Sequence, residues 1–446
     1  MNLDTPHTIA IPQVIENGLS SKIIYKGPFT LKSNGRLIEL EGTISYLTNP
    51  RPEVCFVGKV LNGSLNSLFS AEYLELTTPT DIKGSFNLTS INPSYSRIGS
   101  STEIKGELQY ELKMSKQSQY SEINFSLVNF INNYGLAYSF NNRILAGRVE
   151  LQYKNYLVVI DKVPDSKKIY ENLKEQNGFA ITHIGQIKRL DGKEFELEEI
   201  ERFLEKIVWI LSFVAGRRVD INHLYTDLEG YNAICYRIPS ISSWKNIVNW
   251  YPRNSRDSLE KVLYCLLELM EDDYWEKQLP RILSYYFDGF GSSYIDNKII
   301  IIQAGLETLA WAYLVETKEV LSKNKYNALG SAASKMERLL KELKIDFRGD
   351  DIPGIQEMKL NSKSGPQFLS TIRNDIVHPE RKKTKLNDEQ LYFTWRMGIV
   401  YFELALLAIG GYEGEYCNML LNFDYLAKRV QKVPWSESNT TTEKLV

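Results

Sequence analysis

Residues 195–216, FELEEIERFLEKIVWILSFVAG, mark the point at which the sequence changes from strand-like to helix-like patterning. Apolar side chains recur at Phe203, Ile207 and Ile210, which is the spacing of one face of an α-helix. Gly216 follows as a helix-ending residue, because glycine readily adopts the left-handed conformation of a C-terminal cap. The stretch therefore predicts a helix, and it divides the chain into a strand-rich part and a helical part.

The residues before this helix form short runs rich in β-branched and aromatic side chains, separated by Gly, Pro, Asn and Ser. Examples are IIYKGPFTL at 23–31 and GRLIELEGTISYL at 35–47, and the pattern continues to about residue 160. FAITHIGQIKRLDG at 179–192 predicts a final pair of strands, because Asp191-Gly192 is a turn signal. Many short strands at this spacing predict an antiparallel sandwich-like or barrel-like domain.

The residues after Gly216 become predominantly helical. The longest predicted helix follows Asn387, an N-cap with Gln390 as its capping-box partner, and a last helix is expected around 415–431. The predicted fold class is α+β, a β-rich sandwich-like N-terminal domain followed by an all-α C-terminal bundle. The predicted parts are a β-rich domain at 1–195, a helical middle region at 196–290, the helical bundle at 291–432 and a flexible tail at 433–446.

The composition of the 446 residues restricts the classes of function. A hydrophobic share of 43% and a charged share of 24% are those of a globular protein, and a net charge of −2 limits any nucleic-acid contact to a local surface. The four cysteines lie far apart, so we expect neither a disulfide scaffold nor a cysteine zinc site. The sequence also lacks the common nucleotide-loop, α/β-hydrolase and zincin motifs.

The same reasoning predicts a cytoplasmic protein without a membrane segment. The N-terminus has no basic region followed by an apolar stretch, so we do not expect a signal peptide. The most apolar run, at 399–409, contains Glu403 and is shorter than the ~20 residues of a membrane span. We therefore expect this run to form a buried helix.

The segment STIRNDIVHPE at 370–380 carries the side chains with the clearest chemistry. Arg373 offers a planar cationic fork suited to phosphate oxygens, and His378 can take and give a proton near neutral pH. Such a pair cleaves RNA without a metal, because the ribose 2′-OH is itself the nucleophile. Pro379 predicts that the helix ends at His378, and Asn374, four residues earlier, lies on the same helical face and is expected to orient the imidazole.

One histidine does not easily serve as both base and acid in a single turnover. Arg373 and His378 are five residues apart, which places them about 140° apart around a helix. Two copies of the chain facing each other would supply two histidines and two arginines to one cleft. The chemistry therefore predicts a homodimer.

RNDIVH resembles the R-x4-6-H signature of the HEPN superfamily, with its polar residue after the arginine. A β-rich N-terminal domain, a helical middle and a C-terminal bundle together resemble the ApeA-type anti-phage proteins. The resemblance implies a dimeric, metal-independent endoribonuclease without a cofactor, with Arg373 and His378 catalytic and Asn374 supporting. It also implies that the substrate is RNA, with transfer RNA among the candidates, and that the protein acts in abortive infection. It further implies a phage-derived trigger and an N-terminal domain that senses this trigger or restrains the ribonuclease.

Other residues offer support to this site. The basic residues that follow the motif are expected to bind the RNA backbone or to form a solvated loop; they are Arg381, Lys382, Lys383 and Lys385. Glu307 is expected either to pair with Arg373 or to lie exposed on its helix. The alternative function is a non-catalytic scaffold, in which the β domain recognises a protein or glycan and the bundle dimerises.

Overall fold

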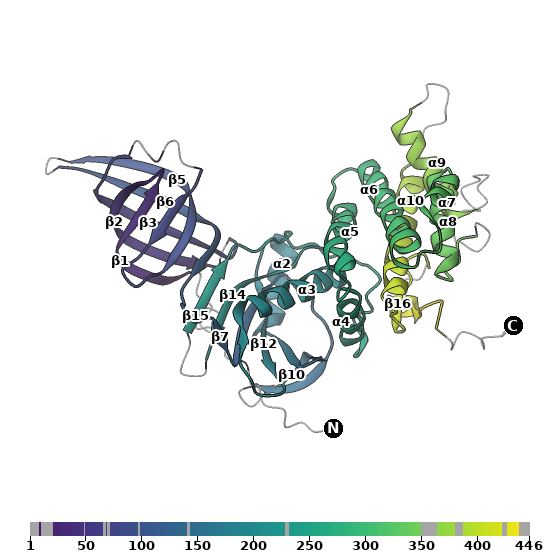
Figure 1. Ribbon diagram of the computed structural model, residues 1–446, viewed down its shortest axis with the longest axis horizontal. Helices are drawn as coiled ribbons and strands as arrows, with labels where there is room; N and C mark the ends of the chain where they lie inside the picture. The colour runs from purple at the N-terminus through teal and green to yellow at the C-terminus, as the bar shows by residue number, and fades with distance from the viewer. Residues whose placement is uncertain are drawn as a thin grey trace. The chain divides into compact units, whose positions relative to one another are not determined.

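The computed structural model describes residues 9, 21–48, 50–65, 68, 72–96, 99–140, 143–227, 232–348, 364–379, 387–421 and 426–436. The chain divides into two compact units, one of Met1–Leu204 with Val219–Asn246 and one of Glu205–Arg218 with Ile247–Val446. The first unit contains the large sheet and the second contains most of the helices (Figure 1). The predicted α+β class is confirmed: a β-rich N-terminal region precedes a mostly helical C-terminal region.

Six antiparallel strands of the first unit close into a barrel (Figure 1). They are β1 (Ser21–Ser33), β2 (Arg36–Leu47), β3 (Glu53–Asn62), β4 (Leu74–Thr77), β5 (Lys83–Ser96) and β6 (Gly99–Lys113). The order around the barrel is β1–β2–β3–β6–β5–β4, and β4 returns to β1 through the pair Leu31↔Leu76. The predicted sandwich-like domain is thus a closed barrel, whose strands bury one set of alternating side chains inside.

Aromatic rings fill the barrel. The rings of Phe29, Phe56 and Phe86 meet edge to face, with centroids 5.7 and 5.3 Å apart for successive pairs. Gly106 lies against them, because a Cβ at this position would come within 2.4 Å of the Phe56 ring and 2.8 Å of the Asn87 carbonyl oxygen. Only glycine permits this close approach of strand and ring.

Seven further strands continue the sheet from β6 in the order β15, β14, β8, β12, β11, β10, β9. They are β8 (Glu122–Val128), β9 (Leu136–Phe140), β10 (Arg143–Tyr153), β11 (Tyr156–Lys162), β12 (Ile181–Arg189), β14 (Asp220–Thr226) and β15 (Asn232–Arg237). Two short strands, β7 (Gln119–Tyr120) and β13 (Phe195–Glu196), pair separately, and helix α2 spans Ser166–Gln176. The strand pair expected at 179–192 is a single strand, β12, whose partners β8 and β11 come from earlier in the chain.

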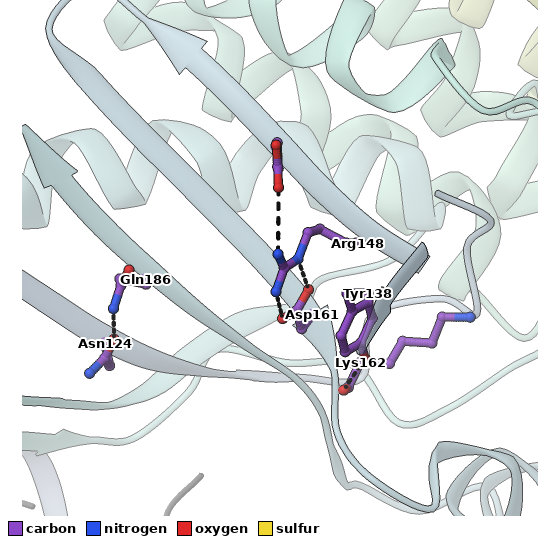
Figure 2. Close-up of polar contacts among 7 residues, drawn as sticks. Asn124, Tyr138, Arg148, Asp161, Lys162 and Gln186 are labelled. Carbon is purple, nitrogen blue, oxygen red and sulfur yellow. Dashed lines mark hydrogen bonds and ion pairs between the residues drawn. The ribbon is translucent and has the colours of Figure 1, made fainter. Parts of the chain in front are cut away.

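A buried ion pair joins two strands of this sheet (Figure 2). Arg148 on β10 donates from Nε and Nη2 to the two carboxylate oxygens of Asp161 on β11, at 2.8 and 2.7 Å. The guanidinium also lies 5.0 Å from the centre of the Tyr138 ring, whose hydroxyl donates to the Lys162 carbonyl oxygen. Because an unpaired buried charge costs several kcal/mol, about 3–5 when one partner is removed, the pair holds β10 and β11 in one register.

The helix predicted from residues 195–216 is confirmed as α3 (Leu197–Ala215). It ends at Gly216, whose φ of +69° lies in the left-handed region that glycine tolerates best. The next two strands, β14 and β15, return to the sheet of the first unit. The region 196–290 is therefore shared between the two units and contains strands as well as helices.

The second unit consists mainly of helices. They are α4 (Ser258–Leu269), α5 (Asp273–Gly291), α6 (Ile295–Trp311) with the π-helix η2 (Ala312–Thr317), α7 (Lys323–Ala328), α8 (Ala332–Glu342), α9 (Gly365–Val377) and α10 (Asp388–Ile409). Helix α6 packs against both α5 and α10 and buries Ile299, Ile302, Leu306 and Leu309, the stripe that its sequence predicts. The two apolar helices α6 and α10 therefore lie at the centre of the bundle.

Helix α10 begins as predicted, with the capping box of Asn387 and Gln390 formed in both directions. By length and composition, Ile295–Thr317 and Asp388–Ile409 are each apolar enough to cross a membrane, but half and nearly three quarters of their most apolar stretches are buried inside the protein. The run 399–409 is the buried helix that was expected.

The prediction of a last helix around 415–431 is wrong. Two short strands, β16 (Glu415–Cys417) and β17 (Val430–Lys432), pair instead, and a 3-10 turn, η4 (Leu426–Arg429), precedes the second. The Asn418 side chain accepts a hydrogen bond from the backbone N–H of Leu420 at 3.0 Å, and the N–H of Cys417 donates to the Trp250 carbonyl at 2.6 Å. These contacts satisfy the backbone in an extended and turned form, which competes with a helix.

Candidate active site at the end of helix α9

Helix α9 carries the predicted catalytic residues, and its sequence fixes both of its ends. Ser364 caps the first turn by accepting from the N–H of Gln367 at 3.2 Å, and Pro366 lies in that turn, where no N–H is needed. The buried side chains of Phe368, Leu369 and Ile372 hold one face of the helix in the bundle. The C-terminal turn is thus presented from a firmly packed element.

His378 caps the C-terminus of α9, as the following proline predicts. Its backbone N–H donates to the Asn374 carbonyl oxygen at 2.8 Å, and its φ of −123° and ψ of 70° have left the helical region. The imidazole is exposed and has no hydrogen-bond partner among the residues that the structure describes. The imidazole is therefore accessible to a substrate.

Arg373 is half-buried and Asn374 is exposed. Nη1 of Arg373 donates to Oδ1 of Asn374 at 3.2 Å, so the Asn374 side chain contacts the guanidinium rather than the imidazole. Asn374 contributes to His378 only through its backbone carbonyl. The expected contact between Asn374 and the imidazole is thus replaced by one that orients the fork of Arg373.

Glu307 lies half-buried on α6. Its Oε1 accepts from Nε2 of Gln303 at 3.1 Å, and its backbone carbonyl accepts from the Tyr326 hydroxyl at 3.3 Å. Between Glu307 and Arg373, both within the described ranges, no ion pair is formed. The basic residues Arg381, Lys382, Lys383 and Lys385 lie outside the described residues.

Two other histidines lie among the described residues of the first unit, and both are buried. His183 contacts Oγ1 of Thr182 at 3.0 Å and Oδ1 of Asn133 at 3.1 Å, and the ring of His223 stacks on Tyr236 with centroids 4.3 Å apart. Burial lowers the pKa of both imidazoles, and that of His223 to about 3. Both are neutral packing groups, which leaves His378 as the accessible histidine of the described chain.

One group of potential metal ligands lies elsewhere in the described residues. Oxygen atoms of Glu111 and Glu201 and the Cys235 sulfur lie within 4.8 Å of one another. The guanidinium of Arg237 pairs with both carboxylates, at 3.9 Å from Glu111 and closer to Glu201. The positive charge of the Arg237 side chain thus already neutralises this acidic group. None of the three residues of the group lies near α9 in the sequence.

The bundle also contains a buried carboxyl group that the sequence shows only as an interruption of an apolar run. Glu403 on α10 is 1% exposed, and its Oε1 accepts from the Tyr286 hydroxyl at 2.6 Å. Burial raises the pKa of Glu403 to about 8, although Tyr286 and the Trp250 backbone oppose the shift by hydrogen bonding. At neutral pH this carboxyl is therefore largely protonated.

Comparisons with known proteins identify the family. Residues 272–430 match the family described as the YopA C-terminal domain, and residues 115–226 match the YopA central domain. The SPbeta prophage-derived uncharacterized protein YopA of Bacillus subtilis (strain 168) is 33% identical over 427 residues, which cover 92% of this chain and 94% of the relative. No solved structure matches. Identity at this level over nearly the whole length shows that the chain belongs to the YopA family.

Proposed function

We propose that this chain is a metal-independent endoribonuclease whose active site is the C-terminal end of α9. The observation that carries the proposal is the exposed imidazole of His378 at the end of a packed helix, five residues after an arginine whose fork is held by Asn374. Arg373 and His378 are the catalytic residues, and Asn374 is a positioning residue. The resemblance of RNDIVH to the HEPN signature supports the same assignment.

The reaction needs only proton transfers and charge stabilisation. An imidazole accepts the 2′-OH proton, the 2′-oxygen bonds to the adjacent phosphorus, and the bond from phosphorus to the 5′-oxygen breaks. A second imidazole, in its protonated form, gives a proton to the departing 5′-oxygen. The guanidinium of Arg373 stabilises the negative charge that develops on the phosphoryl oxygens. The products are a 2′,3′-cyclic phosphate and a 5′-hydroxyl.

A homodimer supplies the second imidazole. Two copies of α9 facing each other would place two His378 and two Arg373 side chains at one cleft, so that one histidine acts as base and the other as acid. We therefore propose that the active form has at least twice the 51.4 kDa mass of the chain.

The biological role we propose is defence against phage by cleavage of RNA in the infected cell, with transfer RNA among the candidate substrates. An unrestrained ribonuclease would harm its own cell. The β-rich first unit, whose barrel and sheet carry no accessible histidine among the described residues, is proposed to sense a phage-derived trigger or to restrain the bundle.

The test is incubation of the purified protein with total RNA in excess EDTA, with and without lysate of phage-infected cells. We expect RNA fragments that end in 2′,3′-cyclic phosphate, and DNA of the same sequence should stay intact because it lacks the nucleophile. The species that cleaves RNA should have the mass of a dimer when it is measured by light scattering. If RNA survives under every condition, or if cleavage requires a divalent ion, the proposal fails and the scaffold alternative gains.

A further inference from the structure

Three arginines from separate segments of the second unit meet beside the short strand β16; they are Arg253, Arg396 and Arg429. Nε of Arg396, on α10, donates to the carbonyl oxygen of Met419 at 3.4 Å. The carbonyl oxygen of Arg429 accepts from the N–H of Asn418 at 2.8 Å. Arg253 lies three residues after Trp250, whose carbonyl oxygen accepts from the N–H of Cys417 at 2.6 Å. The three arginines thus approach three consecutive residues, 417–419.

The charges of these arginines act on one buried sulfur atom. Burial raises the pKa of the Cys417 thiol to about 11, and the positive charges of all three arginines oppose this rise. Glu403 acts on the same thiol in the opposite sense, but this carboxyl is largely protonated at neutral pH. The three arginine side chains are also partly exposed. Their positive charge therefore reaches the surface of a chain whose net charge is −2.

An exposed aromatic ring lies next to this group of charges. Tyr392 is 53% exposed, one turn before Arg396 on α10, and the guanidinium carbon of Arg396 lies 6.0 Å from the centre of its ring. The ring also contacts Trp395, with centroids 5.5 Å apart. Trp395 is buried and fixed, because its Nε1 donates to the Gly289 carbonyl oxygen at 2.8 Å. Tyr392 is thus supported from below while half of it stays accessible.

Tyr392 and the three arginines form one surface, which we call the arginine face. Acidic side chains limit it on one side, because Asp388 and Glu389 are exposed in the first turn of α10. Negative groups of a ligand are therefore expected on the side of Tyr392 that carries the arginines.

The composition of the arginine face selects one class of ligand. Guanidinium groups bind phosphate oxygens with a planar fork, and an exposed ring offers a surface on which a base can stack. A single RNA strand presents both groups, whereas a duplex keeps its bases stacked inside. An acidic peptide would use the arginines but would leave the ring of Tyr392 without a matching group.

We infer that the arginine face binds single-stranded RNA outside the active site, with phosphates at the arginines and a base against Tyr392. The inference rests on the proposed function, because that function supplies RNA as the ligand. Helix α10, which carries Tyr392 and Arg396, packs against α9, which carries the catalytic residues. The arginine face would thus hold one part of a strand while another part reaches His378.

The experiment measures binding of a fluorescent single-stranded RNA by anisotropy, with EDTA, over a series of salt concentrations. The protein is the full chain with His378→Ala, so that the RNA stays whole. Arg396→Gln in this background should weaken binding by about 3- to 30-fold, because a charge-assisted hydrogen bond is lost. The slope of log K against log salt should also become shallower by about 0.7, the value for one phosphate of a single strand.

The ring makes a different prediction from the charge. Tyr392→Ala should weaken binding by about 5- to 100-fold, the usual effect of one stacked base, and should leave the salt slope unchanged because tyrosine carries no charge. Tyr392→Phe keeps the ring and should bind as the background protein does. A duplex of the same sequence should bind more weakly and should not respond to Tyr392→Ala.

Two exposed residues elsewhere serve as matched controls. Tyr110→Ala removes an exposed ring from the first unit, and Arg281→Gln removes an exposed arginine from α5. Both should bind as the background protein does. The inference is overturned if Tyr392→Ala and Arg396→Gln bind single-stranded RNA with the affinity and salt slope of the background, or if the duplex binds as tightly as the single strand.

Cleavage assays separate this inference from the proposed function. With His378 present, Tyr392→Ala and Arg396→Gln should raise KM for RNA more than they lower kcat, because both residues lie outside the active site. Cleavage with an unchanged KM in both variants overturns the inference and leaves the function intact. Binding that depends on the arginine face, without cleavage under any condition, supports the inference and refutes the function.

Discussion

Replacement of His378 by alanine is expected to lower the rate of RNA cleavage by about 10²- to 10⁴-fold, the contribution of a general acid or base. In a homodimer the substitution removes both imidazoles, so base and acid are lost together. The folded structure should not change, because the His378 side chain is exposed and has no hydrogen-bond partner among the described residues. The measurement is the initial rate of cleavage of one labelled RNA in EDTA, together with the melting temperature.

Variants of neighbouring residues on α9 make this result specific. Arg373→Ala should lower the rate to a similar extent, and Arg373→Lys should restore part of it, because lysine keeps the charge but lacks the planar fork. Thr371→Ala, at an exposed position on the same helix, is the matched control and should cleave as the wild type does. Full activity in His378→Ala would remove the histidine from the mechanism, whatever the other variants did.

Replacement of Glu403 by glutamine is expected to remove a pH dependence of stability. In the wild type, the pKa of Glu403 is about 8 in the folded chain and about 4.5 in the unfolded chain. The folded state therefore holds a proton that the unfolded state releases between these values, and the free energy of unfolding falls as pH rises through this window. The slope is at most ~1.4 kcal/mol per pH unit, and the whole window amounts to no more than about 5 kcal/mol.

The measurement is urea unfolding of both proteins at pH 5.0, 6.5 and 8.5, followed by tryptophan fluorescence. Glutamine stays neutral at every pH, so Glu403→Gln should gain stability relative to the wild type as pH rises. The difference between the two proteins cancels the titration of His183 and His223, which affects both equally. Glu389→Gln, an exposed position on α10, should follow the wild type. Parallel curves for the wild type and Glu403→Gln would show that Glu403 is ionised in the folded chain.

Local sequence patterns predicted the elements of this fold better than their arrangement. The period of residues 197–215 and the glycine after them define α3, and the Asn387 capping box defines the start of α10, because both signals are local. The barrel depends on the pairings of β4 with β1 and of β3 with β6, which join segments far apart in the sequence. The alternation of apolar and polar residues predicts each strand but not the strand with which it pairs, so it did not distinguish a sandwich from a barrel.

The failure at 415–431 has the same origin. The spacing of its apolar residues suits a helix. However, the backbone N–H of Cys417 donates a hydrogen bond to the carbonyl of Trp250, more than a hundred residues earlier, and the Asn418 side chain stabilises a turn. At the candidate site, the proline after His378 correctly predicted the end of α9, whereas the contact of Asn374 depended on the rotamer of Arg373.

The most direct test of the central claim replaces one ribose by deoxyribose. A labelled RNA whose cleavage position has been mapped is prepared with a single 2′-deoxy nucleotide immediately 5′ to the scissile phosphate, and both RNAs are incubated with the wild-type protein in EDTA. The account predicts that the substituted RNA stays whole at that position while other positions are cut at the normal rate, because the attacking oxygen has been removed. Cleavage at the deoxy position would show that the nucleophile is not the ribose, and attack by the 2′-hydroxyl through Arg373 and His378 would be contradicted.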